Sequence, residues 1–135
     1  MKYKTQKVAM TYFYGALVLF LAQLAFGVLA GTVYVMPNTL SVILPFNIIR
    51  MIHTNALIVW LLMGFMGATY YLLPEETETE LFSPKLAIVQ FWTFFIAAGI
   101  TVVGYMFKIH EGREFLEQPF AIKVGIVLVV LMFLF

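Results

Sequence analysis

One histidine of this chain lies inside a long stretch that carries no formal charge. His53 follows Arg50 by three residues, and the run from Met51 to Leu73 contains no Asp, Glu, Lys or Arg. On a helix, residues three apart share a face, so Arg50 would lie one turn nearer the water on the face of His53. An imidazole can ligate a metal, and a guanidinium can bind a carboxylate through two hydrogen bonds. The pair is therefore a candidate site at the rim of a membrane helix.

The face of His53 continues along the same helix through residues three or four apart, several of them small: Ala56, Leu57, Trp60, Gly64, Gly67 and Tyr71. A low face of this kind accepts either a closely packed neighbouring helix or a flat prosthetic group. Neutral imidazole bound to a haem iron would explain a histidine at this depth, and Arg50 would then face the haem propionates. The simpler alternative is a histidine hydrogen-bonded between helices beside a glycine packing notch.

A second feature is the acidic stretch "EGREFLEQP". Glu114 and Glu117 are three residues apart, so both would project to one side of a helical turn. Such a pair could hold Ca²⁺, which takes six to eight oxygen ligands, or could conduct protons inward. It could equally be a solvated loop whose acids offset Arg113. A further acidic run is expected to be solvated and to form no site: Glu75, Glu76, Glu78 and Glu80.

The composition is that of a membrane protein. Hydrophobic residues make up 63% of the chain and charged residues 11%, and the mean hydropathy is +0.98, which is far too apolar for a soluble domain of 135 residues. The net charge of +1, with its Lys and Arg scattered, gives no basis for nucleic-acid binding. The absence of Cys excludes disulfides and thiolate metal sites.

The elements that would position these residues are membrane helices. We expect an all-α membrane fold with three full transmembrane helices and a truncated fourth, at about 8–36, 51–73, 84–107 and 119–135. Residues 1–135 would form a single helical segment, which we expect to be part of a larger subunit. Ser83 followed by Pro84 is a typical helix start.

Short connections predict antiparallel neighbours, so the first and third connections share one side of the membrane. The charged and titratable residues there would collect at a single membrane face: Arg50, His53, Glu111, Glu114 and Glu117. Three Lys precede the first helix and one Arg follows it, which favours a cytoplasmic amino terminus.

These motifs resemble a known family. "PFNIIRMIHTNALIVWLLMGFMGATYYLLPEE", then "LFSPKLA", then "GREFLEQP", closely resembles the amino-terminal part of the large catalytic subunit of bacterial respiratory nitric oxide reductases, in the haem-copper oxidase superfamily. The resemblance runs almost from end to end of the chain and covers the first quarter to third of such a subunit, which has twelve transmembrane helices. It implies a multi-pass protein of the bacterial cytoplasmic membrane and the reaction of two NO, two electrons and two protons to N₂O and water.

The resemblance also implies roles for the residues singled out above. His53 matches an axial ligand of the low-spin haem b, and Arg50 matches an arginine near the haem propionates. Glu114 matches a glutamate that helps to bind a calcium bridging two haems, and Glu117 matches one linked to proton uptake from the periplasmic side. Haem b₃ and a non-haem iron are expected from helices beyond this chain.

Some features depart from the family pattern. The remaining iron ligands have no counterpart, so this chain by itself is not expected to reduce NO, and the connector before "GREFLEQP" is short. With no large hydrophilic domain before the first helix, the cytochrome c-dependent type is favoured. Its expected partners are membrane lipid, the remainder of the catalytic subunit and a small membrane-anchored haem c subunit.

Other functions fit the same residues. A related member of the superfamily, such as an NO dismutase or an oxygen-reducing enzyme, would differ in ligands that lie downstream. A haem-free membrane protein for assembly or partner binding would use His53 only to hydrogen-bond between helices. A transporter is the weakest alternative, because His53 is the one ionisable residue well inside an uncharged run.

Overall fold

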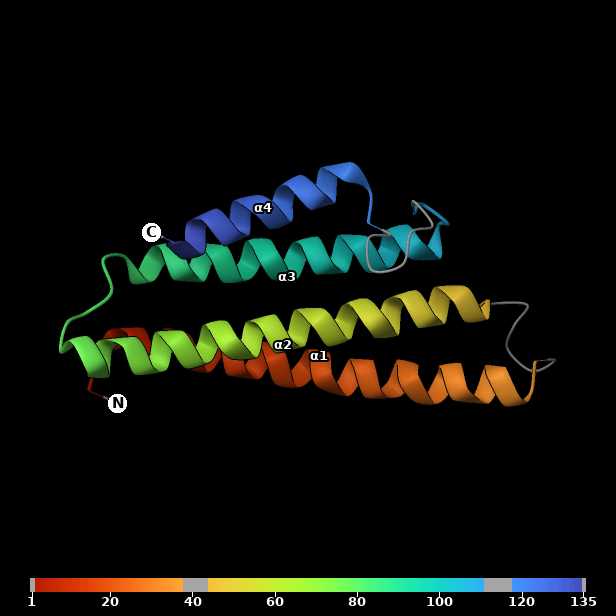
Figure 1. Ribbon diagram of the computed structural model, residues 1–135, viewed down its shortest axis with the longest axis horizontal. Coiled ribbons are helices and arrows are strands. Elements are labelled where there is room, and N and C mark those ends of the chain that lie inside the picture. The colour runs from red at the N-terminus through yellow and green to blue at the C-terminus, as the bar shows by residue number, and fades with distance from the viewer. Residues whose placement is uncertain (1, 38–43, 111–117, 135) are drawn as a thin grey trace.

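The chain folds as a bundle of antiparallel helices, seen in a computed structural model that describes residues 2–37, 44–110 and 118–134. Those residues form four α-helices and no strand: α1 (Lys4–Val35), α2 (Phe46–Thr77), α3 (Pro84–Met106) and α4 (Phe120–Leu134). The amino terminus, the α2–α3 connection and the end of α4 lie at one end of the bundle (Figure 1). The all-α fold is confirmed.

The outer surface of the helices is apolar, as a lipid environment requires. Helices α1, α2 and α3 are each long and apolar enough to cross a membrane, and α4 contains a shorter apolar stretch, Ile122–Met132. Large apolar side chains on α1 are exposed in a row: Leu17, Val18, Leu21, Leu24 and Val28. Because lipid tails are as apolar as these side chains, their exposure carries no penalty in a bilayer. The chain is a multi-pass membrane protein.

Two helices extend beyond the uncharged runs that predict them. Helix α1 starts at Lys4 rather than near residue 8, and α2 spans Phe46–Thr77 rather than 51–73. An uncharged run marks the part of a helix that can lie in hydrocarbon, whereas the helix itself continues for as long as its backbone is satisfied. Helix α2 passes through the buried Pro74, which has no N–H to donate, and ends at Glu78 in the left-handed conformation (φ 54°).

The start of α1 is held by acidic residues from the far side of the sequence. The Glu80 carboxylate accepts hydrogen bonds from the backbone N–H groups of Lys4 (2.6 Å) and Thr5 (3.2 Å) and from the Thr5 hydroxyl (2.7 Å). Gln6 Nε2 donates to Glu75 Oε1 at 2.8 Å. The Glu80 carboxylate thus satisfies N–H groups that have no partner within the helix. The acidic run, expected to be merely solvated, therefore includes two residues that anchor α1.

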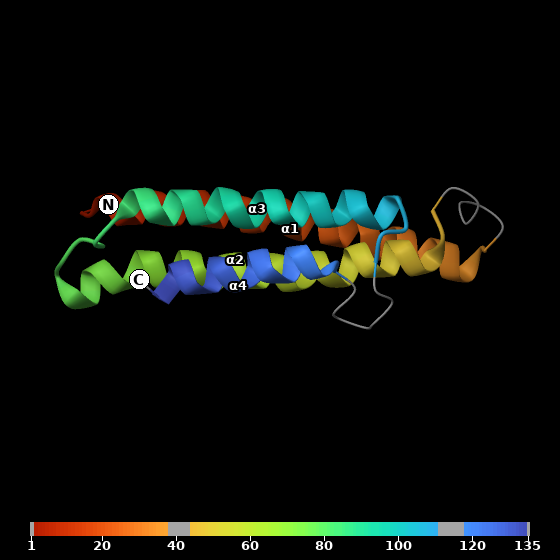
Figure 2. The same ribbon diagram turned by 90° about the horizontal axis from the view of Figure 1, so that it is seen from above.

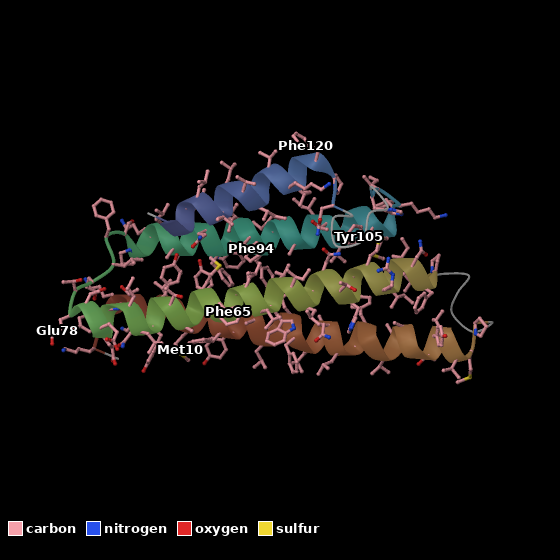
Figure 3. All side chains as sticks on the ribbon, viewed as in Figure 1. Met10, Phe65, Glu78, Phe94, Tyr105 and Phe120 are labelled. Atoms are coloured by element: carbon pink, nitrogen blue, oxygen red, sulfur yellow. The ribbon has the colours of Figure 1, made fainter. Side chains whose placement is uncertain are left out.

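The bundle consists of two helix pairs. Helix α1 packs closely along α2, and α3 packs mainly on α4, with fewer contacts between the pairs (Figure 2). Phe94 and Tyr105, both buried, lie on the side of α3 that faces α2 (Figure 3). Helix α3 begins at Pro84, where the Ser83 hydroxyl accepts the N–H of Leu86 at 3.3 Å. The antiparallel order is as expected, but α2 and α3 are less intimate neighbours than α1 and α2.

One buried carboxamide joins all four helices near the end where the chain starts. Gln90 on α3 is fully buried, and its Oε1 accepts from Tyr70 of α2 at 2.6 Å. The single hydroxyl hydrogen of Tyr12, on α1, has two acceptors, the Ala87 carbonyl at 2.7 Å and Gln90 Oε1 at 3.0 Å. Gln90 Nε2 donates to the Val129 carbonyl of α4 at 2.7 Å. Without water in this region, Gln90 links the two helix pairs at a fixed register.

Replacing this carboxamide tests its role. Gln90→Leu keeps the side-chain size but removes the acceptor that Tyr12 and Tyr70 share, so we expect the free energy of unfolding in detergent to fall by about 1–3 kcal/mol. Thr93→Val, on the same helix, is the control because the Thr93 hydroxyl bonds only to the Val89 carbonyl one turn before it. Equal losses for the two variants would contradict a special role of Gln90.

The Glu80 contact predicts acid sensitivity at the start of α1. Hydrogen bonds from the Thr5 hydroxyl and the Lys4 amide hold the pKa of the Glu80 carboxyl below its ordinary value. A lowered folded-state pKa gives stabilisation that is present above the ordinary Glu pKa of about 4.3 and is lost as the pH falls through the folded value. We expect normalised hydrogen-exchange protection of the Lys4 and Thr5 amides to fall in that acid range.

Glu80→Gln should lose that protection already at neutral pH. Glu76→Gln removes the same charge from an exposed position outside the cap and is the matched control. Protection that does not change between neutral and acidic pH in the unmodified chain would show that the carboxylate is dispensable.

Candidate functional site

His53 lies in the second turn of α2, half-buried against α1. Its Nδ1 is 2.8 Å from the backbone carbonyl oxygen of Gln23, in the middle of α1. The side-chain Nε2 of Gln23 lies 3.5 Å from the same ring nitrogen. The nearer contact is of ordinary hydrogen-bond length, and the farther one is at the limit of a hydrogen bond. The imidazole is therefore tied to the backbone of α1.

The carbonyl partner determines which ring nitrogen carries the proton. A carbonyl oxygen can only accept, so Nδ1 of His53 is the protonated nitrogen when this bond forms. Nε2 of the neutral ring then has a free lone pair. Histidines that ligate metals commonly donate the proton of their other nitrogen in this way.

A glycine on α1 allows the ring to lie this close. A Cβ built at Gly27 would be 2.8 Å from Cε1 and 3.0 Å from Nδ1 of His53. Gly27 is four residues after Gln23, so the imidazole lies over the helical turn whose carbonyl it binds. At Gly31, one turn further along α1, a Cβ would meet nothing within 4 Å.

The rest of the expected face of α2 divides into parts. A Cβ at Gly67 would be 3.1 Å from the Tyr12 Cβ, so this glycine is a packing notch for α1, whereas Gly64 borders open space. Trp60 contacts Phe20 of α1 edge to face, with ring centroids 5.1 Å apart. Its indole N–H is buried and finds no hydrogen-bond partner within the part of the chain that the structure describes. The packing alternative thus accounts for Gly67 but not for Gly64.

Arg50 occupies the position that the sequence predicts, one turn before His53 near the start of α2, and is half-buried. Glu111, Glu114 and Glu117 lie outside the described residues, so the proposed calcium and proton roles gain no geometry. His110 follows α3, and its Nδ1 is buried without a hydrogen-bond partner among residues 2–37, 44–110 and 118–134. Those same residues contain no cluster of three or more His, Cys, Asp or Glu suited to a metal ion.

An apolar cavity of about 290 Å³ lies between the two helix pairs, on another face of α2. Asn55 lines it and accepts a hydrogen bond from Gln118, which ties α2 to the residues before α4. Ala56, expected on the face of His53, lines this cavity, and His53 does not. The histidine and the cavity are therefore separate features.

Sequence reasoning missed the polar residues that hold the site and the bundle. Gln23, Asn55 and Gln90 are carboxamides within uncharged runs, and each is buried. Such a side chain needs a partner inside the protein just as an ionisable one does. That signal is lost when only ionisable residues are considered. The spacing of Gln23 and Gly27 would also have indicated a shared helix face.

Comparison with known proteins identifies the family. Residues 7–135 match the family model described as Cytochrome C and Quinol oxidase polypeptide I. The chain belongs to this family. The resemblance to the haem-copper oxidase superfamily is thereby confirmed, and the helices and the His53 site are those of an oxidase polypeptide I protein.

Among relatives, this family member is similar to a nitric oxide reductase subunit of Stutzerimonas stutzeri. The two are 50% identical over 149 aligned residues, which cover 100% of this chain and 31% of that protein. The chain thus spans about a third of the length of the relative it matches. Because the alignment is longer than the chain, the relative has residues in the matched region that this chain lacks.

Proposed function

We propose that this chain is the haem-binding amino-terminal portion of a respiratory nitric oxide reductase, in which His53 is an axial ligand of the low-spin haem b. The single observation that carries the proposal is the hydrogen bond between Nδ1 of His53 and the Gln23 carbonyl. It leaves Nε2 as the nitrogen with a lone pair for iron. The 50% identity to a nitric oxide reductase subunit supports the assignment.

The residues around His53 fit such a ligand. The Gln23 carbonyl orients the ring and keeps its proton on Nδ1, and Gly27 gives the ring room beside α1. The apolar surroundings exclude water and so favour the neutral imidazole that iron requires. When bound, haem supplies one-electron transfer, with a potential set by its axial ligands and their hydrogen bonds.

Arg50 is proposed to pair with the haem propionates at the membrane rim. It precedes His53 by one helical turn on the same helix, so it lies on the water side of the ligand. A guanidinium suits carboxylates because it presents two parallel N–H donors. It would hold carboxylate charge at the edge of the bilayer.

The remaining roles rest on the family resemblance. Glu114 would help to bind calcium, and Glu117 would take part in proton uptake. The remainder of the catalytic subunit would bring the second haem ligand, haem b₃ and the non-haem iron, and a small haem c subunit would deliver electrons. The assembly would lie in a bacterial cytoplasmic membrane with the amino terminus on the cytoplasmic side.

The ligand role predicts a specific spectroscopic loss. In the enzyme assembled with the rest of the subunit, His53→Gly should remove the low-spin haem signal, because one axial bond to iron is gone. Added imidazole should restore the signal by filling the space that the side chain leaves. Thr54→Ala, on the next residue of α2, should keep the spectrum unchanged.

A His53→Gly enzyme with a normal low-spin spectrum would refute the ligand assignment. It would favour the haem-free alternative, in which His53 only hydrogen-bonds α2 to α1.

The propionate role predicts a change in redox potential. Arg50→Ala removes a positive charge beside the haem, which should stabilise the oxidised form and lower the midpoint potential of the low-spin haem. Arg50→Lys keeps the charge but not the two-point hydrogen bonding, so its shift should be smaller. Redox titrations of the assembled enzyme measure both values. Identical midpoints in all three proteins would make Arg50 an ordinary residue of the membrane rim.

A further inference from the structure

We infer that the α1 turn from Gln23 to Gly27 is a positioning element that tunes the electron-donor strength of His53 and thereby the potential of the low-spin haem. The inference rests on the proposed haem ligation and adds to it residues of another helix. Neither Gln23 nor Gly27 touches the haem in this scheme. They act through the imidazole.

The hydrogen bond gives the chemical basis. Nδ1–H of His53 donates to the Gln23 carbonyl across 2.8 Å. Partial withdrawal of this proton by the carbonyl leaves more electron density on the ring, so Nε2 becomes a stronger donor. A stronger axial donor stabilises ferric over ferrous iron and lowers the midpoint potential. Weakening this bond should therefore raise the potential.

The steric basis is the missing side chain at position 27. A Cβ there would be 2.8 Å from Cε1 and 3.0 Å from Nδ1 of His53, which is too short for carbon and nitrogen atoms in contact. Either the ring or the helix has to move away, and both movements lengthen the bond to the carbonyl. A backbone carbonyl cannot be removed by substitution, but Gly27→Ala perturbs it through the ring that it binds.

The chain offers a matched control on the same helix. Gly31→Ala adds the same methyl group and the same gain in helix propensity, at a position where a Cβ meets nothing within 4 Å. Gln23→Leu is a second control because it removes the carboxamide nitrogen 3.5 Å from the ring and keeps the carbonyl. Together the two controls separate the carbonyl from the side chain and the methyl group from its position.

The test is a redox titration of the low-spin haem in the assembled enzyme. For Gly27→Ala we expect the ratio of reduced to oxidised haem at a fixed potential to rise about threefold to tenfold, where tenfold is about 59 mV for one electron. Gly31→Ala and Gln23→Leu should match the unmodified enzyme. The inference is overturned if Gly27→Ala matches Gly31→Ala, or if Gln23→Leu shifts the potential as much as Gly27→Ala.

A second measurement covers loss of haem from the Gly27→Ala enzyme. His53 and His110 are the two histidines of this chain, so nitrogen resonances of the 15N-labelled 135-residue chain in detergent can be assigned with His110→Asn. We expect the Nδ1–H tautomer at His53 in the unmodified chain and in Gly31→Ala, and its loss in Gly27→Ala. An unchanged tautomer in Gly27→Ala would overturn the inference.

These results distinguish the inference from the function on which it rests. A low-spin signal that depends on His53 but keeps its potential in Gly27→Ala contradicts only the tuning role. A low-spin signal that survives His53→Gly contradicts the ligation, and the tuning of that haem falls with it.

Discussion

Polar groups inside the hydrocarbon region of a membrane have no water to bind, so each has to find its partner within the protein. This constraint governs the bundle. Gln90, fully buried, brings hydroxyls from α1 and α2 and a carbonyl from α4 to one point on α3. Asn55 and Gln118 make a second polar link nearer the other end. Apolar contacts alone would leave the register of the helices loosely determined, because the surrounding lipid competes for them equally well.

The same constraint shapes the histidine site. An imidazole at this depth is tolerated because the Gln23 carbonyl satisfies Nδ1, and that bond in turn selects the nitrogen left for a metal. Structural satisfaction and readiness for ligation are thus one arrangement. Gly27 is part of it because the carbonyl is within reach only where α1 has no side chain against the ring.

Membership in the oxidase polypeptide I family gives this arrangement its context. A chain that covers 31% of its relative carries one histidine for a haem together with the helix that orients it. Two helix pairs joined at Gln90 present that histidine on one face of α2 and an apolar cavity on another. The haem-free alternative uses the same hydrogen bond, so redox and spectroscopic behaviour, rather than packing, separates the two functions.

The sequence by itself determined the membrane class, the helical fold, the family resemblance and the placement of Arg50 and His53 on neighbouring turns. These features depend on hydropathy and on the 3.6-residue period, which are local properties of the chain. Local pattern also placed the start of α3 at Ser83 and Pro84. It did not place the ends of α1 and α2, because contacts of Glu80 and Glu75 with residues near the amino terminus extend both helices past their uncharged runs.

Only the tertiary structure decided which groups meet. The partner of His53 lies 30 residues away and the Tyr12 partner of Gln90 lies 78 residues away. Which helix faces which is determined by packing among all four helices, and the periodicity of one helix contains no information about its neighbour. For that reason the sequence could propose an imidazole ligand but not its protonated nitrogen, and could note small residues without separating the notch at Gly67 from the open position at Gly64.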